Sequence, residues 1–466
     1  MMFFENIFSR FYTIFAPFKI GIMLSNNAVR YTLNHLLTVA LPADEVLRYA
    51  VGITREEVVI LFDEGKSLAL PLFSEKQQKA FLDGTAECQW VDTADEEELI
   101  PLFPAGNEHY PLPYDIITPS FMLLSRQEEI FSRERDPHGR FPWRDSLARR
   151  YRFLNTPLVD EYAMLLRQWI LENLLPDYPL VPRQPQVIPT HDVDHLFRFH
   201  GGWQAFRSIF GRDLLINRRL SDVRTSWREY RACRRDSSKD PYVLAIDELI
   251  EQSKARNLKS VFFFKALHFL EPDCTYNVGD AVVRGCVERI LQAGMEVGIH
   301  GSYESYVDPE RFAVEKSRLN QILRQEVTAG RQHFLRFACD TPAGPPPTEH
   351  TTRTGTLRVW EQNGIKDDYT LGFAEMAGFR CGTCHPYPLY DLEKDEPTTV
   401  MEHPLIVMDG TLWDYMNLSI EQSDELIDRL RHRCAAVEGD FVILWHNHLL
   451  GRNYTDAYKT IYLQQI

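Results

Sequence analysis

The chain from residue 186 onward alternates between short apolar runs and stretches in which apolar residues recur at helical spacing. The apolar runs predict strands at 187–194, 261–264, 295–300, 334–337, 405–408 and 441–446. The helical stretches include 245–250, 282–292, a helix that starts at Asp308, 357–363 and 419–436. Because repeated strand and helix units give parallel strands, the pattern predicts an α/β fold, either a barrel or an open doubly wound sheet.

The pattern before residue 186 is different. Residues 24–110 mix short apolar runs with an acidic patch, which predicts a small α/β domain. Residues 111–185 are mainly helical, with apolar positions at helical spacing from Leu158 to Ile170. Four prolines between 176 and 185 then interrupt the helical pattern, so we expect a boundary there and a separate domain over 186–466.

Composition limits the kinds of partner. The 466 residues are 44% hydrophobic and 25% charged, which is typical of a globular chain long enough for two or three domains. A formal net charge of -15 argues against binding to nucleic acid or anionic lipid, because both require a basic surface. Small or neutral partners fit this charge better.

The cysteines and the first residues bear on the compartment. Eight cysteines in so long a chain make no disulfide framework, which favours a reducing compartment and a cytoplasmic location. The stretch Met1–Met23 is apolar but is interrupted by charged residues, so we expect neither a signal peptide nor an integral membrane segment. Translation could also start at Met23.

Two carboxylates end the first predicted strand. Asp192 and Asp194 are two residues apart in an extended run, so their side chains point to the same face and can converge on one ion. His191 and His195 would then point away. An isolated pair of this kind is also compatible with an Asx-rich turn that caps a helix.

Further polar residues fall at the ends of later strands. His300, Arg336 and His446 each lie at or near a strand end in the predicted order. Because the carboxyl ends of parallel barrel strands converge on one mouth, we expect these side chains to gather there with the two aspartates. Any one of them alone could be a structural residue.

These motifs, in this order, resemble the five motifs of the polysaccharide deacetylases of the NodB-homology group. They are 190–194, 298–302, 336–337, Asp368 with 370–373, and 444–446. The resemblance covers residue 186 to the end, and the preceding region is similar to an uncharacterised N-terminal domain found in a bacterial subset of that family. It implies a distorted (β/α)7 barrel that removes acyl groups from N-acetylated sugars with a divalent metal, zinc being the expected ion.

The resemblance also implies a role for each matching residue. The catalytic set is Asp192 as general base, His446 as the acid that protonates the leaving amine, Arg336 as the arginine that orients the base, and Asp368. Asp194 and His300 match metal ligands. These roles agree with the chemistry, because amide hydrolysis needs a polarised carbonyl, a base for the water and an acid for the nitrogen.

The chain departs from the family motif at one position. The family places a second metal histidine four residues after the first, and this chain has Glu304 there. Glu304 could bind the metal through a carboxylate oxygen, which would favour harder ions such as Mn, Fe or Mg, or it could face solvent. His333 could supply a further ligand or be structural.

Three functions therefore remain open. The first is a metal-dependent hydrolase that removes N-acyl groups from an amino-sugar-containing carbohydrate. The second is a catalytically impaired carbohydrate-binding protein of the same fold. The third is a hydrolase of another non-peptide C–N bond, such as that of a cyclic ureide.

Overall fold

A computed structural model describes residues 24–43, 47–95, 98–106, 108–132, 134–200, 202–215, 220–266, 276–339, 353–450 and 456–466. The predictions for Met1–Met23 lie outside these residues. Among the described helices, none has both the length and the apolar character that a bilayer span requires.

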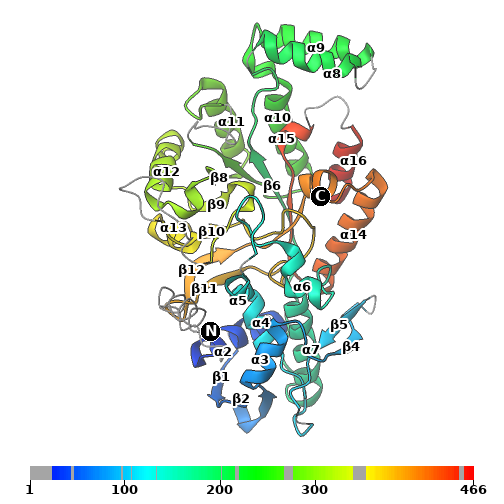
Figure 1. The fold of residues 1–466 in the computed structure, drawn as a ribbon, viewed down its shortest axis with the longest axis vertical. Coiled ribbons are helices and arrows are strands. Elements are labelled where there is room, and N and C mark those ends of the chain that lie inside the picture. The colour runs from blue at the N-terminus through cyan, green and yellow to red at the C-terminus, as the bar shows by residue number, and fades with distance from the viewer. Residues whose placement is uncertain are drawn as a thin grey trace, which may run out of the picture.

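A curled sheet of nine strands forms the centre of the second part of the chain (Figure 1). In spatial order the strands are β11 (Tyr387–Asp391), β12 (Glu396–Glu402), β10 (Asp367–Asp368), β9 (Ala329–Gln332), β8 (Glu296–Gly301), β7 (Val261–Phe264), β6 (Val187–Val193), β14 (Phe441–Leu444) and β13 (Leu405–Met408). Neighbouring strands are parallel except β11 and β12. The predicted parallel α/β architecture is confirmed, as an open, barrel-like sheet with β11 and β13 at its edges in the described residues.

Helices follow the strands and cover the outside of this sheet (Figure 1). They are α10 (Pro241–Ala255), α11 (Ala281–Gln292), α12 (Pro309–Leu323), α13 (Thr356–Gln362), α14 (Ile420–Ala436), α15 (Asn447–Leu450) and α16 (Asp456–Gln465). Asp308 caps α12 by accepting from the backbone N–H of Arg311, and Ser419 forms a capping box with Gln422 at the start of α14. The predictions for α11, α13, α14 and the start of α12 agree with the structure within one residue, whereas α10 extends four to five residues beyond each end of the stretch 245–250.

The strand that was predicted at 334–337 lies earlier. β9 ends at Gln332, and a 3₁₀ turn over His333–Leu335 follows, in which Phe334 has a φ of 60°. β9 can pass close to α13 because Gly330 has no side chain, and an added Cβ would lie 2.9 Å from the ring of Trp360. This shift decides which arginine occupies the strand end.

Residues 24–185 form helices and two small sheets. The helices are α2 (Asn26–Ala40), α3 (Glu75–Leu82), α4 (Ile117–Leu124), α5 (Gln127–Phe131), α6 (Leu147–Arg150) and α7 (Leu158–Asn173). Antiparallel strands β1 (Tyr49–Ile53), β2 (Glu57–Phe62) and β3 (Ser67–Pro71) form one sheet, and β4 (Gln89–Asp92) with β5 (Leu99–Leu102) forms the other. Helices α4 to α7 follow the two small sheets along the chain.

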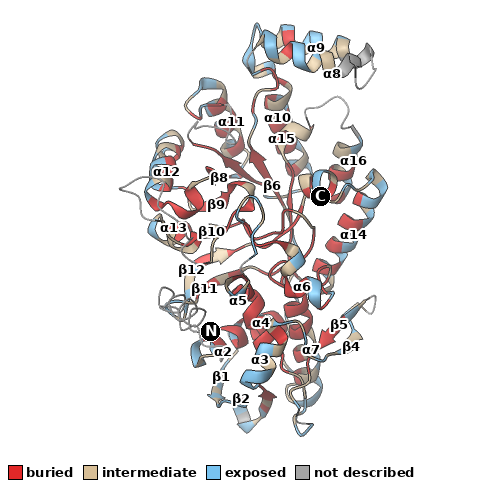
Figure 2. Ribbon diagram, in the orientation of Figure 1, coloured by how far each residue is buried: buried red, intermediate tan, exposed pale blue. Residues whose placement is uncertain are grey.

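This first part shares a continuous core with the large sheet (Figure 2). The hydroxyl of Tyr31 on α2 donates to the carbonyl of Pro388 on β11, and its ring lies 4.8 Å from that of Tyr390. Glu129 forms a buried ion pair with Arg380 at 2.9 Å. The domain limits at residues 110 and 185 therefore stay predictions, since the packing runs across the second of them.

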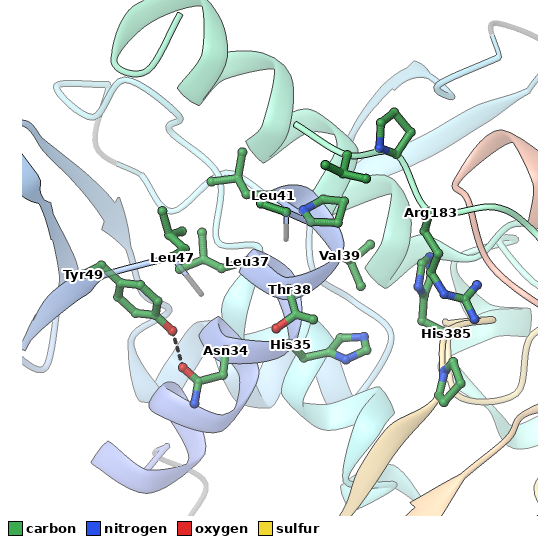
Figure 3. A pocket seen from close by; sticks show the side chains of 15 residues that line it. Asn34, His35, Leu37, Thr38, Val39, Leu41, Leu47, Tyr49, Arg183 and His385 are labelled. Carbon is green, nitrogen blue, oxygen red and sulfur yellow. Dashed lines mark hydrogen bonds between the residues drawn. The ribbon is translucent and has the colours of Figure 1, made fainter. Parts of the chain in front are cut away.

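A cavity of about 870 Å³ lies between α2 and the segment 181–183 (Figure 3). Its walls include Leu37, Leu41 and the buried ring of His35. Burial lowers the pKa of His35 to about 3, so this imidazole is neutral at pH 7. None of the residues predicted for the active site lines this cavity.

Candidate functional site

The end of β6 brings two carboxylates to one side of the sheet. Oδ2 of Asp192 and Oδ1 of Asp194 each lie 3.4 Å from Nε2 of His300 on β8, which β7 separates from β6 in the sheet. His191 points the other way, and its Nδ1 lies 2.8 Å from the carbonyl oxygen of Trp445. The same-face geometry expected from the Asp-x-Asp spacing is confirmed.

Asp194, His300 and His333 form a group suited to a metal ion. One ligand atom from each residue lies within 4.8 Å of the others, and Nε2 of His333 is 3.5 Å from Oδ1 of Asp194. His300 donates through Nδ1 to the carbonyl of Arg331 at 2.9 Å, which leaves the lone pair of Nε2 facing the carboxylates.

Two atoms of this group, one from Asp194 and one from His300, lack a hydrogen-bond partner in the described part of the chain. Oδ1 of Asp194 and Nε2 of His300 are buried and have no hydrogen-bond partner among the described residues. Burial also lowers the pKa of His300, which favours the neutral ring. Acceptors that face each other at 3.4 Å are stable only with positive charge between or beside them, so these residues fit a divalent cation.

Lys265 is a cation that sequence reasoning missed. It follows β7 directly, is buried, and places Nζ 3.6 Å from Oδ1 of Asp194. Burial raises the pKa of Asp194, but the charges of His333 and Lys265 outweigh it and hold that pKa well below its usual value. Any ion at this carboxylate would therefore share it with an ammonium group.

Glu304 lies outside the group, so its predicted position beside Asp194 and His300 was wrong. Its carboxylate oxygens lie 3.4 Å from Nη2 of Arg353 and 3.7 Å from Nη1 of Arg336. The four-residue spacing assumed a helical turn that begins at His300. In the structure β8 continues to Gly301 and the next helical turn starts only at Ser305, so residues 300 and 304 do not share a helix face.

Arg331 holds the place that was expected for Arg336. Its Nη1 donates to Oδ1 of Asp192 and to Oγ1 of Thr190, both at 2.9 Å, and its Nε donates to the carbonyl of Tyr369. The guanidinium is fully buried and lies 4.7 Å from the ring centre of Phe263. Burial raises the pKa of Asp192, but His300 and Arg331 outweigh it, so the carboxyl is held ionised.

Arg336 serves a different part of the molecule. It donates to the carbonyls of His138 and Tyr303 and, at 2.7 Å, to the hydroxyl of Tyr306. Its predicted contact with Asp192 is absent from the described contacts, because the strand ends at Gln332, five residues earlier than the apolar pattern suggested.

His446 faces the site from the end of β14. Its Nδ1 lies 2.7 Å from Oδ1 of Asp409, and its Nε2 lies 3.5 Å from Oδ2 of Asp194. Burial lowers the pKa of His446, but Asp409 and Asp194 outweigh it and raise that pKa well above its usual value. Asp409 directly follows β13, so the strand-end argument would have found it had it been applied there.

Asp368 is not brought to this group. Its Oδ1 accepts from the backbone N–H of Thr370, two residues further along, at 2.9 Å. Burial raises its pKa, and the neighbouring Glu402 on β12 is also fully buried. The structure therefore places Asp368 in a buried carboxyl pair, away from Asp192 and His446.

The site opens into a cavity of about 380 Å³, large enough for a small ligand. Besides the residues above, its walls include Arg140, Phe334, Trp413, Asp414, Tyr415 and Tyr458. The rings of Trp413 and Tyr458 stack with centres 3.8 Å apart, and the guanidinium of Arg140 lies 5.7 Å from the centre of the Tyr415 ring. The walls thus combine flat apolar faces with polar groups.

Comparison with known proteins gives a match to the first part of the chain. Residues 20–175 match DUF7033, a family of unknown function. No curated protein sequence matches the chain. The matched range ends before β6, so it contains none of the residues of the candidate site.

Three solved structures have similar folds over part of the chain. A candidate polysaccharide deacetylase from Mycobacterium smegmatis is 15% identical, with a TM-score of 0.37 over 61% of this chain and 84% of that one. PuuE allantoinase is 12% identical, with a TM-score of 0.32 over 60% and 82%. A mutant of BA3943, a CE4 family pseudoenzyme with restored enzymatic activity, is 10% identical, with a TM-score of 0.25 over 61% and 65%. Because all three TM-scores are below 0.5, the function is argued from the geometry of the site.

Proposed function

We propose that this protein is a metal-dependent hydrolase that removes the acetyl or another N-acyl group from an amino-sugar-containing carbohydrate. The observation that carries the proposal is that three sets of side chains line one cavity. They are Asp192, which accepts from the buried Arg331, then Asp194 with His300 and His333, and finally His446 with Asp409. Amide hydrolysis needs a base, a Lewis acid and an acid, and these groups can supply each of them.

The metal would be held by Asp194, His300 and His333. When bound, a divalent ion would polarise the acyl carbonyl and lower the pKa of a water molecule. Two imidazoles and one carboxylate suit zinc, and the set contains the second histidine that the sequence motif lacked at residue 304. Zinc is therefore the ion we propose.

Asp192 would act as the base. Arg331 occupies its Oδ1, so Oδ2 is the oxygen that faces the centre of the site and can accept a proton from water. Because Arg331 is buried and held by two further acceptors, the carboxylate cannot rotate without losing these contacts. Arg331 is thus a positioning residue for the base.

His446 would act as the acid. Asp409 binds Nδ1, so the proton on Nε2 points toward Asp194 and the cavity. An amide nitrogen is too basic to leave as an anion, and a protonated imidazole at this position can donate to it as the C–N bond breaks. Trp413 and Tyr458 would contact the apolar face of a sugar ring in the same cavity.

The test is release of acetate from a panel of N-acetylglucosamine monomers and short oligomers by the zinc-loaded protein, beside allantoin as a cyclic ureide. Acetate release that Asp192→Asn abolishes without loss of zinc, and that Glu304→Gln leaves intact, is the expected result. Opening of allantoin without acetate release would support the other C–N hydrolase. Oligomer binding without any turnover would support the carbohydrate-binding alternative.

A further inference from the structure

A pair of helices projects beyond the sheet and its covering helices. α8 (Trp203–Leu215) and α9 (Leu220–Cys233) follow β6 and precede α10 along the chain. They lie against each other at the top of Figure 1. The buried rings of Phe199, Phe206 and Tyr230 form a cluster of their own, separate from the main core. The packing of the large sheet and its covering helices therefore does not explain the side chains on the outer surface of this hairpin.

Large aromatic side chains lie exposed on the hairpin. Trp203, Phe210 and Trp227 are 52%, 37% and 42% exposed. Trp203, Phe206 and Phe210 recur at helical spacing on one face of α8, and the ring centre of Phe206 is 5.2 Å from that of Trp227 on α9. They border a cavity of about 520 Å³ that is also lined by Arg207, Val223 and Arg224. The rings thus form one apolar patch rather than isolated exposed residues.

The sequence that contains these two helices is rich in positive charge. Residues 203–235 contain nine arginines and no lysine against three acidic residues, in a chain whose net charge is -15. Arg224, Arg228 and Arg231 recur at helical spacing along α9 and are exposed, and no ion pair joins them to a described residue. Glu229 on the same helix pairs with Arg198 at 2.5 Å. The stripe of arginines is therefore not neutralised within the described part of the chain.

We propose that the α8–α9 hairpin docks on a membrane surface that contains anionic phospholipid. Trp203 and Trp227 would enter the interfacial layer, where rings with a polar N–H edge are favoured, and Phe210 would add apolar area beside them. The arginines would bind lipid phosphates. Each arginine near an anionic surface contributes about a fivefold factor to binding. The negative net charge of the whole chain argued against binding to anionic lipid, but residues 203–235 are locally positive.

The arrangement favours a membrane over a soluble polyanion. A long nucleic acid or polyanion would also meet the acidic body of the protein, whereas a flat membrane can meet the projecting hairpin alone. The aromatic rings pack on one another as a patch, with Trp203 and Phe206 stacked at 5.2 Å. Base stacking would instead require separate faces along a groove.

The experiment measures sedimentation of the full chain with vesicles of phosphatidylcholine alone and with vesicles that contain about one-third phosphatidylglycerol. Strong binding to the anionic vesicles, weak binding to the neutral ones, and a steep loss with added salt are expected. Quenching of tryptophan fluorescence by brominated lipid tails should accompany binding, and this readout needs no variant.

Two sets of variants test the surface itself. The triple change Arg224→Gln, Arg228→Gln and Arg231→Gln should weaken binding about 100-fold. The matched triple Arg55→Gln, Arg284→Gln and Arg429→Gln removes the same charge from exposed positions elsewhere and should leave binding nearly unchanged. Trp203→Ser with Trp227→Ser should reduce both binding and quenching.

Three results would overturn the proposal. One is equal binding to neutral and anionic vesicles. Another is that a single-stranded oligonucleotide displaces the protein from the vesicles and that the tryptophan variant no longer binds this oligonucleotide. The third is a dimer that the tryptophan variant converts to a monomer, which would assign the patch to a second copy of this chain.

Discussion

Nδ1 of His446 lies 2.7 Å from Oδ1 of Asp409, and the backbone N–H of His446 donates to the other oxygen of the same carboxylate. One buried carboxylate therefore fixes both the backbone and the ring of this histidine. The arrangement orients Nε2 toward the cavity and stabilises the imidazolium.

The first prediction concerns this pair. His446→Ala should lower the rate of amide hydrolysis by about 10²- to 10⁴-fold, because the leaving nitrogen loses its proton donor. Asp409→Asn should lower it less, by about 10- to 100-fold, because the ring remains but is poorly oriented and less basic. The rate constants are measured on an N-acetylated sugar and on an aryl acetate, whose leaving group needs no proton. Equal losses on both substrates would remove His446 from the role of acid.

The second prediction separates the two candidates for the third metal ligand. His333→Ala should strip zinc as completely as Asp194→Ala does, because each removes an atom of the group that faces the ion. Glu304→Ala should leave zinc content unchanged, because Arg336 and Arg353 bind its carboxylate. Elemental analysis of the purified variants provides the measurement.

A zinc content that falls in Glu304→Ala but not in His333→Ala would restore the ligand set suggested by the motif spacing. Lys265→Met serves as a further control. It should raise zinc affinity, because it removes a positive charge 3.6 Å from Oδ1 of Asp194.

The third prediction concerns the two arginines. Arg331→Lys should lower kcat by about 10- to 100-fold with little change in KM or zinc content. A lysine lacks the planar guanidinium that donates to Asp192 while Thr190 and Tyr369 hold it in place. Arg336→Lys is the matched control and should leave kcat nearly unchanged. If Arg336→Lys reduces kcat as much as Arg331→Lys does, the assignment of the positioning arginine is wrong.

Two of the strands that the sequence predicted correctly have continuous apolar residues. Residues 261–264 and 405–408 match β7 and β13, because a strand buried on both faces is apolar at every position. β9 has the sequence Ala-Gly-Arg-Gln and is buried throughout, so its polar residues are satisfied by tertiary hydrogen bonds that no local pattern shows. The strand was predicted at 334–337 because the apolar residues lie there, just after β9.

That one shift accounts for much of what was missed at the site. With the strand end at Gln332, Arg331 and His333 fall into the site and Arg336 leaves it. Asp192, Asp194 and His300 could be predicted because their strands have clear ends. Lys265 and Asp409 also follow clear strands, and the same argument could have reached them. Asp368 was predicted for the site and does not reach it, because a residue at the end of a short strand can also point into the core.

The last prediction is a pH dependence of stability that arises far from the candidate site. Glu128 on α5 is buried, and Oε2 accepts from the backbone N–H of Leu147 at 2.6 Å. Burial raises the pKa of Glu128 to about 8 from an ordinary value of 4.5, although the Leu147 hydrogen bond opposes the shift. Between these two values the folded protein keeps a proton that the unfolded chain releases, so the free energy of unfolding should fall as the pH rises.

The expected size follows from about 1.4 kcal/mol for each unit of pKa shift, which gives a loss of about 2 kcal/mol between pH 6 and pH 8. Glu128→Gln keeps an acceptor for Leu147 but cannot ionise, so urea unfolding of this variant should show a smaller decline over the same range.

Burial also raises the pKa values of Glu161 and Glu315, each to about 7, so part of the decline in stability should persist in the variant. Only the difference between the two proteins reports on Glu128. Glu134→Gln, at an exposed position nearby, should decline as the unmodified protein does. Parallel curves for the unmodified protein and Glu128→Gln would mean that Glu128 is ionised in the fold and that positive charge compensates its burial. Arg380 and Arg150, whose charges lower the pKa of Glu128, are the candidates.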